Sequence, residues 1–243
     1  MNISTHSTPA EANHAAADLL AQWLTSPGIR NVMLAGGNTP LELYRHMGER
    51  KLSLAHLNIF ALDEYVGVPP DEARNCANLI RRTAVVPWGV PVHQYFSISS
   101  LEADALASVQ AHEKRINEAG GVDVIVLGLG QNGHLGFNEP GSAEDSGARV
   151  LDLDPLSVEA NRKWFGGDYA PGRGATVGLK TILAARRVLI MAYGAHKTAA
   201  VKAMLESPCS AACPASLLQE HPHGNVFLDD AVAGALKDRR RTE

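Results

Sequence analysis

Between Ile29 and about Asp230, short apolar runs rich in β-branched residues alternate with longer runs whose apolar residues recur every three or four positions. The short runs are typical of β-strands and the longer ones of amphipathic helices. The expected strands are residues 31–35, 57–62, 93–98, 122–127, 187–193 and 225–228. The expected helices are residues 9–25, 40–50, 76–85, 101–119, 157–165 and 196–206.

The order of these elements predicts the fold class. Strands that alternate with helices are typical of βαβ units, and several of these strands are apolar almost throughout, as strands covered on both faces are. No linker, repeat or low-complexity segment divides the pattern. We therefore expect an α/β fold with a single domain over residues 1–243, in which helices flank a mostly parallel, Rossmann-like sheet.

Two segments, residues 128–149 and 166–176, are rich in Gly, Pro, Asn and Ser and show little periodicity. Long connections without regular structure inside a compact domain are often functional. Ligands of open α/β sheets bind beyond the carboxyl ends of the strands. We expect these segments to be loops and the functional site to lie at that edge.

The composition excludes several classes of protein. The 243 residues are 45% hydrophobic and 20% charged, as in ordinary folded domains, and the net charge of −4 provides no global positive field for a nucleic acid or an anionic membrane. No apolar run approaches the roughly 18 to 20 residues of a membrane span, and the first residues do not resemble a signal peptide. We expect a cytoplasmic protein that holds any anionic ligand locally.

The cysteine content predicts no disulfide framework and no metal site. The three cysteines, Cys76, Cys209 and Cys213, are an odd number and are too sparse for such a framework. The C-x3-C spacing of the last two lacks a second pair or a nearby His at zinc-finger spacing. We interpret all three as reduced thiols.

The first candidate motif follows the strand expected at residues 31–35. Gly36, Gly37, Asn38 and Thr39 lead to Pro40, which is a good first helical residue after a Thr39 N-cap. Two glycines and the free N–H groups of a first helical turn favour a phosphate ligand. A plain strand-to-helix turn also explains these residues.

The second motif, LDEYVGV, places Asp63 and Glu64 directly after the strand expected at residues 57–62. A carboxylate at this position is well placed to act as a general base. Adjacent residues of an extended chain face opposite sides, so one of the two is expected to face the site. The alternative is that both are solvated loop acids.

The third motif, GLGQNGHLGFNEPG, contains Asn132, His134 and Glu139 on one glycine-rich loop. Its glycines match G-x-G-x-x-G, but the dinucleotide fingerprint requires a helix at the third glycine, and here further glycines and a proline follow. A His beside a carboxylate is instead typical of proton transfer near neutral pH. A structural loop His is the alternative.

The fourth candidate feature is cationic. Arg162 and Lys163 lie late in one expected helix, and Lys197 lies in the first turn of another. Because the dipole of that helix disfavours a cation in its first turn, a bound anion explains Lys197 better than helix stability does. Solvated surface residues are the alternative for all three.

Together these motifs resemble the glucosamine-6-phosphate deaminase/isomerase family, within the larger group that also contains the 6-phosphogluconolactonases. The resemblance covers nearly the whole chain and is carried by AGGNTPLELY, LDEYVGV, GLGQNGHLGFNEPG, ATVGLKTIL, VLIMAYGAHKTAAV and PASLLQEH. The LDEYVG and GHLGFNEP segments are similar to the amino-sugar-phosphate branch, whereas the lactonases typically carry DER and GHTASLFPG.

The resemblance implies a role for each candidate residue. Asp63 matches the base that moves a proton between C2 and C1, and His134 and Glu139 match the residues that assist ring opening. The phosphate ligands would be Gly36, Gly37, Asn38, Thr39, Lys197 and either Arg162 or Lys163. Asn132 stands where many members have Asp, so Glu139 is expected to orient the imidazole.

The resemblance implies deamination of an amino-sugar 6-phosphate without a metal, a nucleotide or another cofactor. Glucosamine 6-phosphate is the expected substrate, and galactosamine 6-phosphate is a rival because NCA and PASLLQEH also resemble galactosamine-6-phosphate isomerases. A 6-phosphogluconolactonase and a non-catalytic sugar-phosphate sensor are less favoured. Both a monomer and a homo-oligomer stay open. The polar, glycine-rich ends of residues 145–172 would permit this segment to move as a lid.

Overall fold

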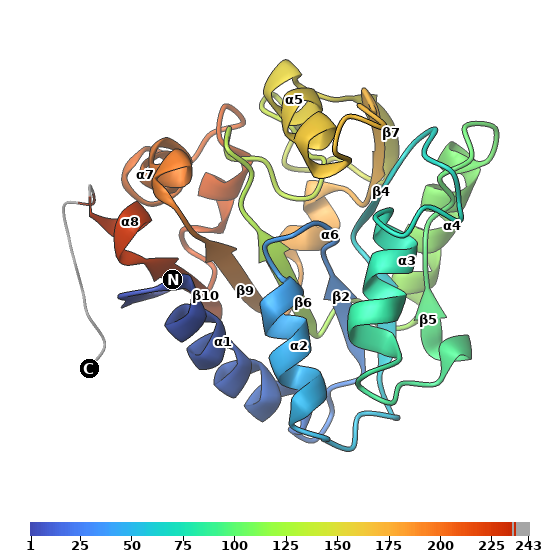
Figure 1. Cartoon of the computed structure of the whole chain (residues 1–243), viewed down its shortest axis with the longest axis horizontal. Helices are drawn as coiled ribbons and strands as arrows, with labels where there is room; N and C mark the ends of the chain where they lie inside the picture. The colour runs from blue at the N-terminus through green and yellow to red at the C-terminus, as the bar shows by residue number, and fades with distance from the viewer. Residues whose placement is uncertain (235, 237–243) are drawn as a thin grey trace.

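The computed structural model describes residues 1–234 and 236, and a sheet of seven strands lies at its centre (Figure 1). Every pairing in this sheet is parallel. The strands in spatial order are β1 (Asn2–His6), β10 (Gly224–Asp229), β9 (Arg187–Ala192), β6 (Val124–Gly128), β2 (Asn31–Leu34), β3 (Asn58–Ala61) and β5 (Tyr95–Phe96). The expected α/β class with a mostly parallel sheet is confirmed.

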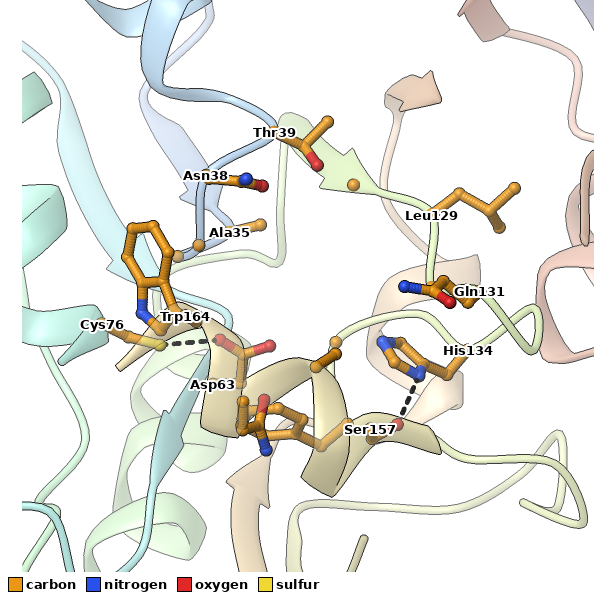
Figure 2. A pocket seen from close by; sticks show the side chains of 18 of the residues that line it. Ala35, Asn38, Thr39, Asp63, Cys76, Leu129, Gln131, His134, Ser157 and Trp164 are labelled. Atoms are coloured by element: carbon orange, nitrogen blue, oxygen red, sulfur yellow. Dashed lines mark hydrogen bonds between the residues drawn. The ribbon is translucent and has the colours of Figure 1, made fainter. Parts of the chain in front are cut away.

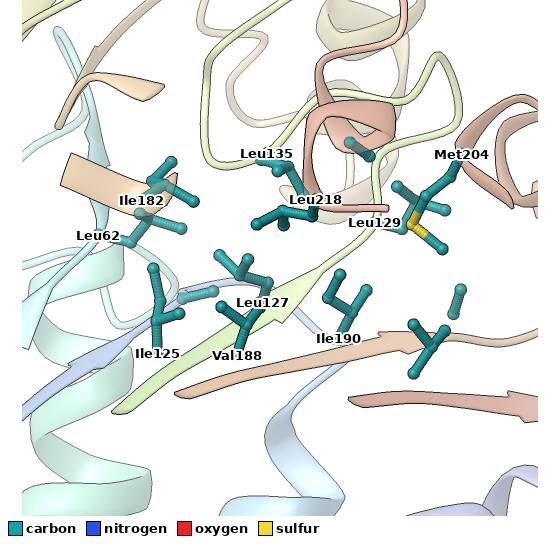
Figure 3. Close-up of a cluster of buried hydrophobic side chains, with 14 of the residues drawn as sticks. Leu62, Ile125, Leu127, Leu129, Leu135, Ile182, Val188, Ile190, Met204 and Leu218 are labelled. Atoms are coloured by element: carbon teal, nitrogen blue, oxygen red, sulfur yellow. The ribbon is translucent and has the colours of Figure 1, made fainter. Parts of the chain in front are cut away.

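Helices cover both faces of this sheet because its central strands are apolar on both sides. On β6, Val124 and Val126 face one buried cluster, while Ile125 and Leu127 face another, which Figure 3 shows. The first cluster is completed by α1 (Pro9–Leu24), α2 (Leu41–Glu49), α3 (Cys76–Ile80) and a π-helical turn over Arg81–Val85. The second is completed by α4 (Ala105–Glu118), α6 (Leu179–Leu183), α7 (Thr198–Glu206), α8 (Asp230–Ala233) and a 3-10 helix over Pro214–Leu218.

A second, antiparallel sheet carries the remaining strands. It has the order β4 (Asp63–Tyr65), β8 (Arg173–Thr176) and β7 (Arg149–Asp152). Helix α5 (Pro155–Trp164) connects β7 to β8, and Figure 1 shows it above the main sheet. Because β4 directly follows β3, the small sheet is joined to the edge at which the main strands end.

The small sheet corrects part of the sequence-based prediction. Residues 173–176 form a strand inside the segment 166–176, which is expected to be a loop. Strand β7 begins at the last residue of the other expected loop, 128–149, and β4 is a separate strand directly after the one expected at residues 57–62. These strands have only three or four residues, and β8 reads RGAT. Such short polar or glycine-containing runs give no apolar alternation, so their pairing depends on tertiary contacts.

Several element boundaries also differ from the prediction. The strand expected at residues 93–98 is reduced to β5 because a 3-10 turn occupies Val92–Gln94. The expected helix 101–119 begins only at Ala105. Strand β1 was missed because NISTH is mostly polar and is recognisable only by its pairing with β10.

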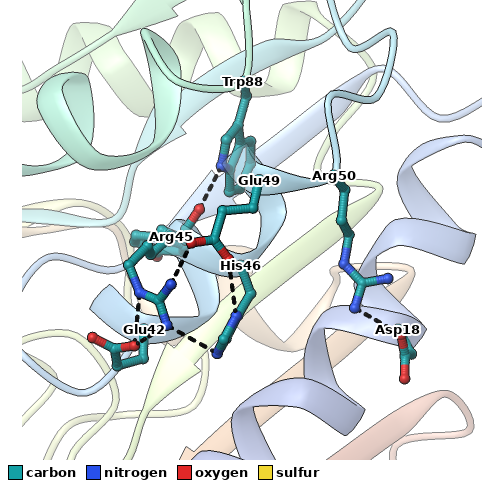
Figure 4. A network of polar contacts seen from close by, with 8 residues as sticks. Asp18, Glu42, Arg45, His46, Glu49, Arg50 and Trp88 are labelled. Atoms are coloured by element: carbon teal, nitrogen blue, oxygen red, sulfur yellow. Dashed lines mark hydrogen bonds and ion pairs between the residues drawn. The ribbon is translucent and has the colours of Figure 1, made fainter.

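The start of α2 is also corrected. Pro40 occupies the N-cap and makes no side-chain capping hydrogen bond, so Thr39 does not cap the helix as expected. Figure 4 shows how the surface of α2 is fixed: Arg45 bridges Glu42 and Glu49. Trp88 Nε1 donates to the α2 carbonyl of Tyr44 at 2.9 Å. These contacts hold the helix that follows the glycine turn.

Within the described residues, no helix is both long and apolar enough to span a membrane. The expected domain boundary at residue 243 lies outside the described residues, because residues 235 and 237–243 are not among them.

Candidate active site

A cavity of about 440 Å³ lies at the carboxyl ends of β2, β3, β6 and β9 (Figure 2). The neighbouring strands β2 and β6 mark the point where the strand order reverses: β3 and β5 follow on the side of β2, and β9 and β10 follow on the side of β6. The cavity therefore lies at a topological switch point. Its lining includes the predicted residues Gly36, Gly37, Asn38, Thr39, Asp63, His134, Lys163 and Lys197.

The glycine turn after β2 forms one wall of the cavity. Gly37 has a φ of +86°, which L side chains rarely adopt. A Cβ on Gly36 would lie 2.5 Å from the Cys76 sulfur, so this turn accepts no side chain there. Because Thr39 does not cap α2, its hydroxyl is available on the cavity side and accepts a hydrogen bond from Lys197 Nζ at 3.1 Å.

Lys197 enters the same wall from the loop after β9. It ends a 3-10 turn over Ala195–Lys197 and precedes α7. Burial lowers the pKa of Lys197 to about 8. Among the described residues, none forms an ion pair with this ammonium group, and an anion in the cavity would compensate for its burial.

Asp63 and Glu64 face opposite sides, as the extended chain predicts. Glu64 accepts hydrogen bonds from the backbone N–H groups of Tyr65, Cys76 and Ala77, which fixes the start of α3. Asp63 lines the cavity. Burial raises the pKa of Asp63 to about 6, because the hydrogen bond from Cys76 and the charge of His134 only partly offset the loss of solvation.

On the loop after β6, His134 and Glu139 form a pair. His134 Nδ1 lies 3.2 Å from Glu139 Oε2, and Asn132 Nδ2 donates to the same oxygen at 2.7 Å. Burial alone would raise the pKa of Glu139. The contacts with His134, Ser157 and Asn132 have the opposite and larger effect, so the pKa is lowered to about 2. An ionised Glu139 favours a proton on Nδ1, which leaves Nε2 of His134, beside Gly130, as an acceptor.

The structure separates the two cations of α5. Lys163 lines the cavity, whereas Arg162 does not. Both side chains are exposed and approach Glu159, at 3.7 Å from Arg162 and 3.5 Å from Lys163. Of the two alternatives left open by the sequence, Lys163 is therefore the one that lies at the cavity.

Some cavity residues were not found from the sequence. Ser157 Oγ lies 3.3 Å from His134 Nδ1, and the Cys76 thiol donates to Asp63 Oδ1 at 3.4 Å, as Figure 2 shows. Trp164, Gln131 and His196 also line the cavity. Ser157 and Trp164 lie on α5, whose position over the main sheet depends on the small sheet that the sequence did not predict. For Cys76 the local NCA pattern was the available signal.

Comparison with known proteins identifies close relatives. A sequence model of the family described as glucosamine-6-phosphate isomerases/6-phosphogluconolactonase matches residues 5–228. A protein named glucosamine-6-phosphate deaminase from Corynebacterium kroppenstedtii is 40% identical over 98% of this chain and 94% of its own length. One of the same name from Cutibacterium acnes is 39% identical over 97% of this chain and 92% of its own length.

Solved structures agree with this assignment. A monomeric glucosamine-6-phosphate deaminase superimposes with a TM-score of 0.91 at 29% identity, covering 97% of this chain and 100% of that chain. A 6-phosphogluconolactonase from Trypanosoma cruzi, 22% identical, shares the fold with a TM-score of 0.80 over 98% of this chain and 97% of its own. With a family match over nearly the whole chain and relatives of about 40% identity, this protein belongs to the family of glucosamine-6-phosphate isomerases and 6-phosphogluconolactonases.

Proposed function

We propose that this chain is a glucosamine-6-phosphate deaminase, which converts glucosamine 6-phosphate and water into fructose 6-phosphate and ammonium. The observation that carries the proposal is one cavity lined by a buried carboxylate, Asp63, and by His134, whose Nδ1 contacts Glu139. Glu139 and Asn132 do not themselves line the cavity. The names of the relatives support the same activity. We place the enzyme in the cytoplasm, with a sugar phosphate as its partner.

The phosphate would bind between the glycine turn and Lys197. The backbone of Gly36 to Thr39 and the ammonium group of Lys197 meet at one wall of the cavity. Lys163 would approach from α5. Since the phosphate is remote from C1 and C2, its binding energy serves to orient the sugar for proton transfer.

Ring opening is the first chemical step in this proposal. His134 Nε2 accepts the proton of the C1 hydroxyl, and the same proton is then delivered to the ring oxygen as the C1–O5 bond breaks. Glu139 holds the imidazole by Nδ1 and stabilises the transient imidazolium. Asn132 donates to Glu139 and adds no second negative charge, so it positions this carboxylate.

Isomerisation and deamination follow. The Asp63 carboxylate removes the C2 proton, which is acidic once C1 is an aldehyde, and an enolamine forms. Asp63 returns the proton to C1, which leaves an imine at C2. Water adds to the imine carbon, and ammonia departs and is protonated to ammonium, so that a ketose phosphate remains.

A substrate comparison tests this function. Ammonium and ketose-phosphate release would be measured from glucosamine 6-phosphate and from galactosamine 6-phosphate, with hydrolysis of 6-phosphogluconolactone as a third assay. We expect ammonium release from glucosamine 6-phosphate. Ammonium from the galactosamine epimer alone would change the substrate but keep the reaction. Hydrolysis of the lactone alone, or no reaction with any of the three, would contradict the proposal.

A further inference from the structure

Cys76 lies between the glycine turn and Asp63, and the reaction proposed above gives it no role. It is 1% exposed and lines the cavity. Its thiol donates to Asp63 Oδ1 at 3.4 Å (Figure 2). Within the part of the chain that the structure describes, this thiol is the one donor that forms a hydrogen bond with the Asp63 carboxylate.

The position of this thiol is fixed from two sides. The backbone N–H of Cys76 donates to Glu64 Oε1 at 3.0 Å, which ties the residue to the neighbour of Asp63. On the other side the sulfur packs against Gly36, where an added Cβ would lie 2.5 Å from it. Packing against Gly36 therefore limits the positions open to the sulfur, which lies beside Asp63.

The two oxygens of Asp63 have different surroundings. Oδ1 accepts from Cys76, while Oδ2 lies toward Gly136 on the loop that carries His134, 3.3 Å from where a Cβ of Gly136 would be. We propose that Cys76 is a positioning residue for the general base, which holds Asp63 Oδ1 so that Oδ2 is directed at the substrate. This inference rests on the function proposed above.

A thiol suits this role because it is a weak hydrogen-bond donor. A strong donor would stabilise the carboxylate and lower its pKa, and a base of lower pKa accepts a carbon-bound proton less readily. Burial raises the pKa of Cys76, so the thiol keeps its proton and stays a donor. Cys76 can thus orient Asp63 with little loss of its basicity.

The test compares Cys76→Ala and Cys76→Ser with the unmodified enzyme. The kcat and KM for glucosamine 6-phosphate would be measured by ammonium release across about pH 5 to 9. The measured quantity is the pH at which kcat/KM falls on the acidic side, here called the acidic limb. Because the substrate phosphate also titrates near pH 6, the position of this limb is compared between variants and is not assigned to Asp63 directly. Cys209→Ala is the control, since Cys209 is an exposed thiol that donates to the Ser216 carbonyl away from Asp63.

The two substitutions are expected to displace the acidic limb of kcat/KM in opposite directions. Cys76→Ala removes a hydrogen-bond donor to the Asp63 carboxylate, so the acidic limb moves about half a pH unit toward higher pH. The loss of orientation of Asp63 lowers kcat about tenfold. Cys76→Ser supplies a stronger donor, so the limb falls by about half a pH unit and kcat falls a few-fold. We expect KM to stay within about twofold in both, because neither substitution removes a group assigned to the phosphate.

A purely structural role of Cys76 would lower the melting temperature and leave the limb in place. An unmoved limb in both variants, or displacement of both in the same direction, would overturn the inference. If Cys76→Ala does not fold, Cys76→Ser decides alone, because a limb at the position of the unmodified enzyme contradicts the proposal. Absence of ammonium release by the unmodified enzyme would instead refute the proposed function, so the two failures are distinguishable.

Discussion

At the scale of single residues, the cavity holds Asp63 where its charge is disfavoured. The residue is 7% exposed, and its carboxylate accepts one weak hydrogen bond, from Cys76. Glu139 is also buried, yet it has His134, Asn132 and Ser157 around it. The two carboxyl groups therefore have pKa values displaced in opposite directions, one raised toward the range of a general base and one lowered to that of a permanent anion.

Asp63→Asn is expected to stabilise the protein while it abolishes turnover. The folded-state pKa of about 6 exceeds the ordinary value of 3.8, so ionisation destabilises the fold progressively as the pH rises from about 4 to 6 and by a constant amount above that. The variant should gain about 1 to 3 kcal/mol in unfolding free energy at pH 8 and almost none near pH 4. Urea unfolding at both values measures this. An equal effect at both would show that the Asp63 charge is not destabilising.

The cations of the cavity are expected to differ in their effect on KM. Lys197→Ala should raise KM for the sugar phosphate at least tenfold and change kcat less, because a charge-assisted contact to phosphate is lost. Lys163→Ala should raise KM a few-fold because that side chain is exposed. Arg162→Ala, the matched control on the same helix, should leave KM within about twofold. A larger effect from Arg162 than from Lys163 would reverse the assignment.

The sequence predicted most of these residues because they follow apolar strands, and residues after neighbouring parallel strands meet at one edge. Asp63, His134 and Lys197 were found in this way. Ser157 was not, because its relevance depends on its distance to His134, which no local pattern encodes. Cys76 belongs to the NCA segment, but its contact with Asp63 is visible only in the structure.

At the scale of elements, α5 and the small sheet form one side of the site. Ser157, Lys163 and Trp164 all reach the cavity from α5, and Ser157 approaches His134 directly. Both ends of α5 connect to short strands, β7 and β8. An element held by so little sheet is a good candidate for movement when a ligand binds.

We expect a sugar phosphate to slow amide hydrogen exchange in residues 145–172. Contacts from the ligand to Lys163 and Ser157 would hold α5 over the cavity and reduce local opening. Exchange followed by mass spectrometry with and without fructose 6-phosphate measures this. Helix α1, which does not line the cavity, is the internal reference. Unchanged exchange in residues 145–172 at a saturating concentration would count against a moving lid.

The elements that the sequence did not predict share one property. β4, β7 and β8 are short, and β4 and β7 each pair with β8 rather than with a strand next to them in a tight hairpin. Their register depends on contacts such as Gly174, which packs so closely on Phe137 that a Cβ would lie 2.4 Å from the ring. Helices such as α1 have apolar residues at helical spacing and, in α1, the N-cap Thr8, so their existence was predictable from the sequence.

At the scale of the whole molecule, the parallel sheet brings together segments that are far apart in the sequence. Thr39 and Lys197 are separated by 158 positions but lie in hydrogen-bonding contact. The outer strands stabilise the sheet without reaching the cavity. β1 lies at one edge, where it pairs with β10 over Asn225–Asp229 and is separated from β2 by three strands.

Deletion of residues 1–6 tests whether β1 stabilises the sheet without contributing to the cavity. The deletion removes the β1 pairing and the contact of the Met1 ammonium with the Gln219 carbonyl. We expect the unfolding free energy to fall by about 2 to 4 kcal/mol, while KM stays within about twofold. Asn2→Ala, which keeps the strand, is the control. A large increase in KM with unchanged stability would show that β1 supports the site directly.

Deamination of an amino-sugar phosphate must break the C2–H bond, whereas lactone hydrolysis and sugar-phosphate binding leave it intact, so the fate of this bond tests the role of Asp63. Glucosamine 6-phosphate deuterated at C2 would be given to the unmodified enzyme and to Asp63→Asn, and both ammonium and the label would be followed by NMR. We expect the unmodified enzyme to remove deuterium from C2 and to turn over the labelled substrate more slowly than the unlabelled one. Asp63→Asn should remove the deuterium at least about 10³-fold more slowly than the unmodified enzyme. Cleavage of this bond by Asp63→Asn at nearly the unmodified rate would contradict the assignment of Asp63 as the base.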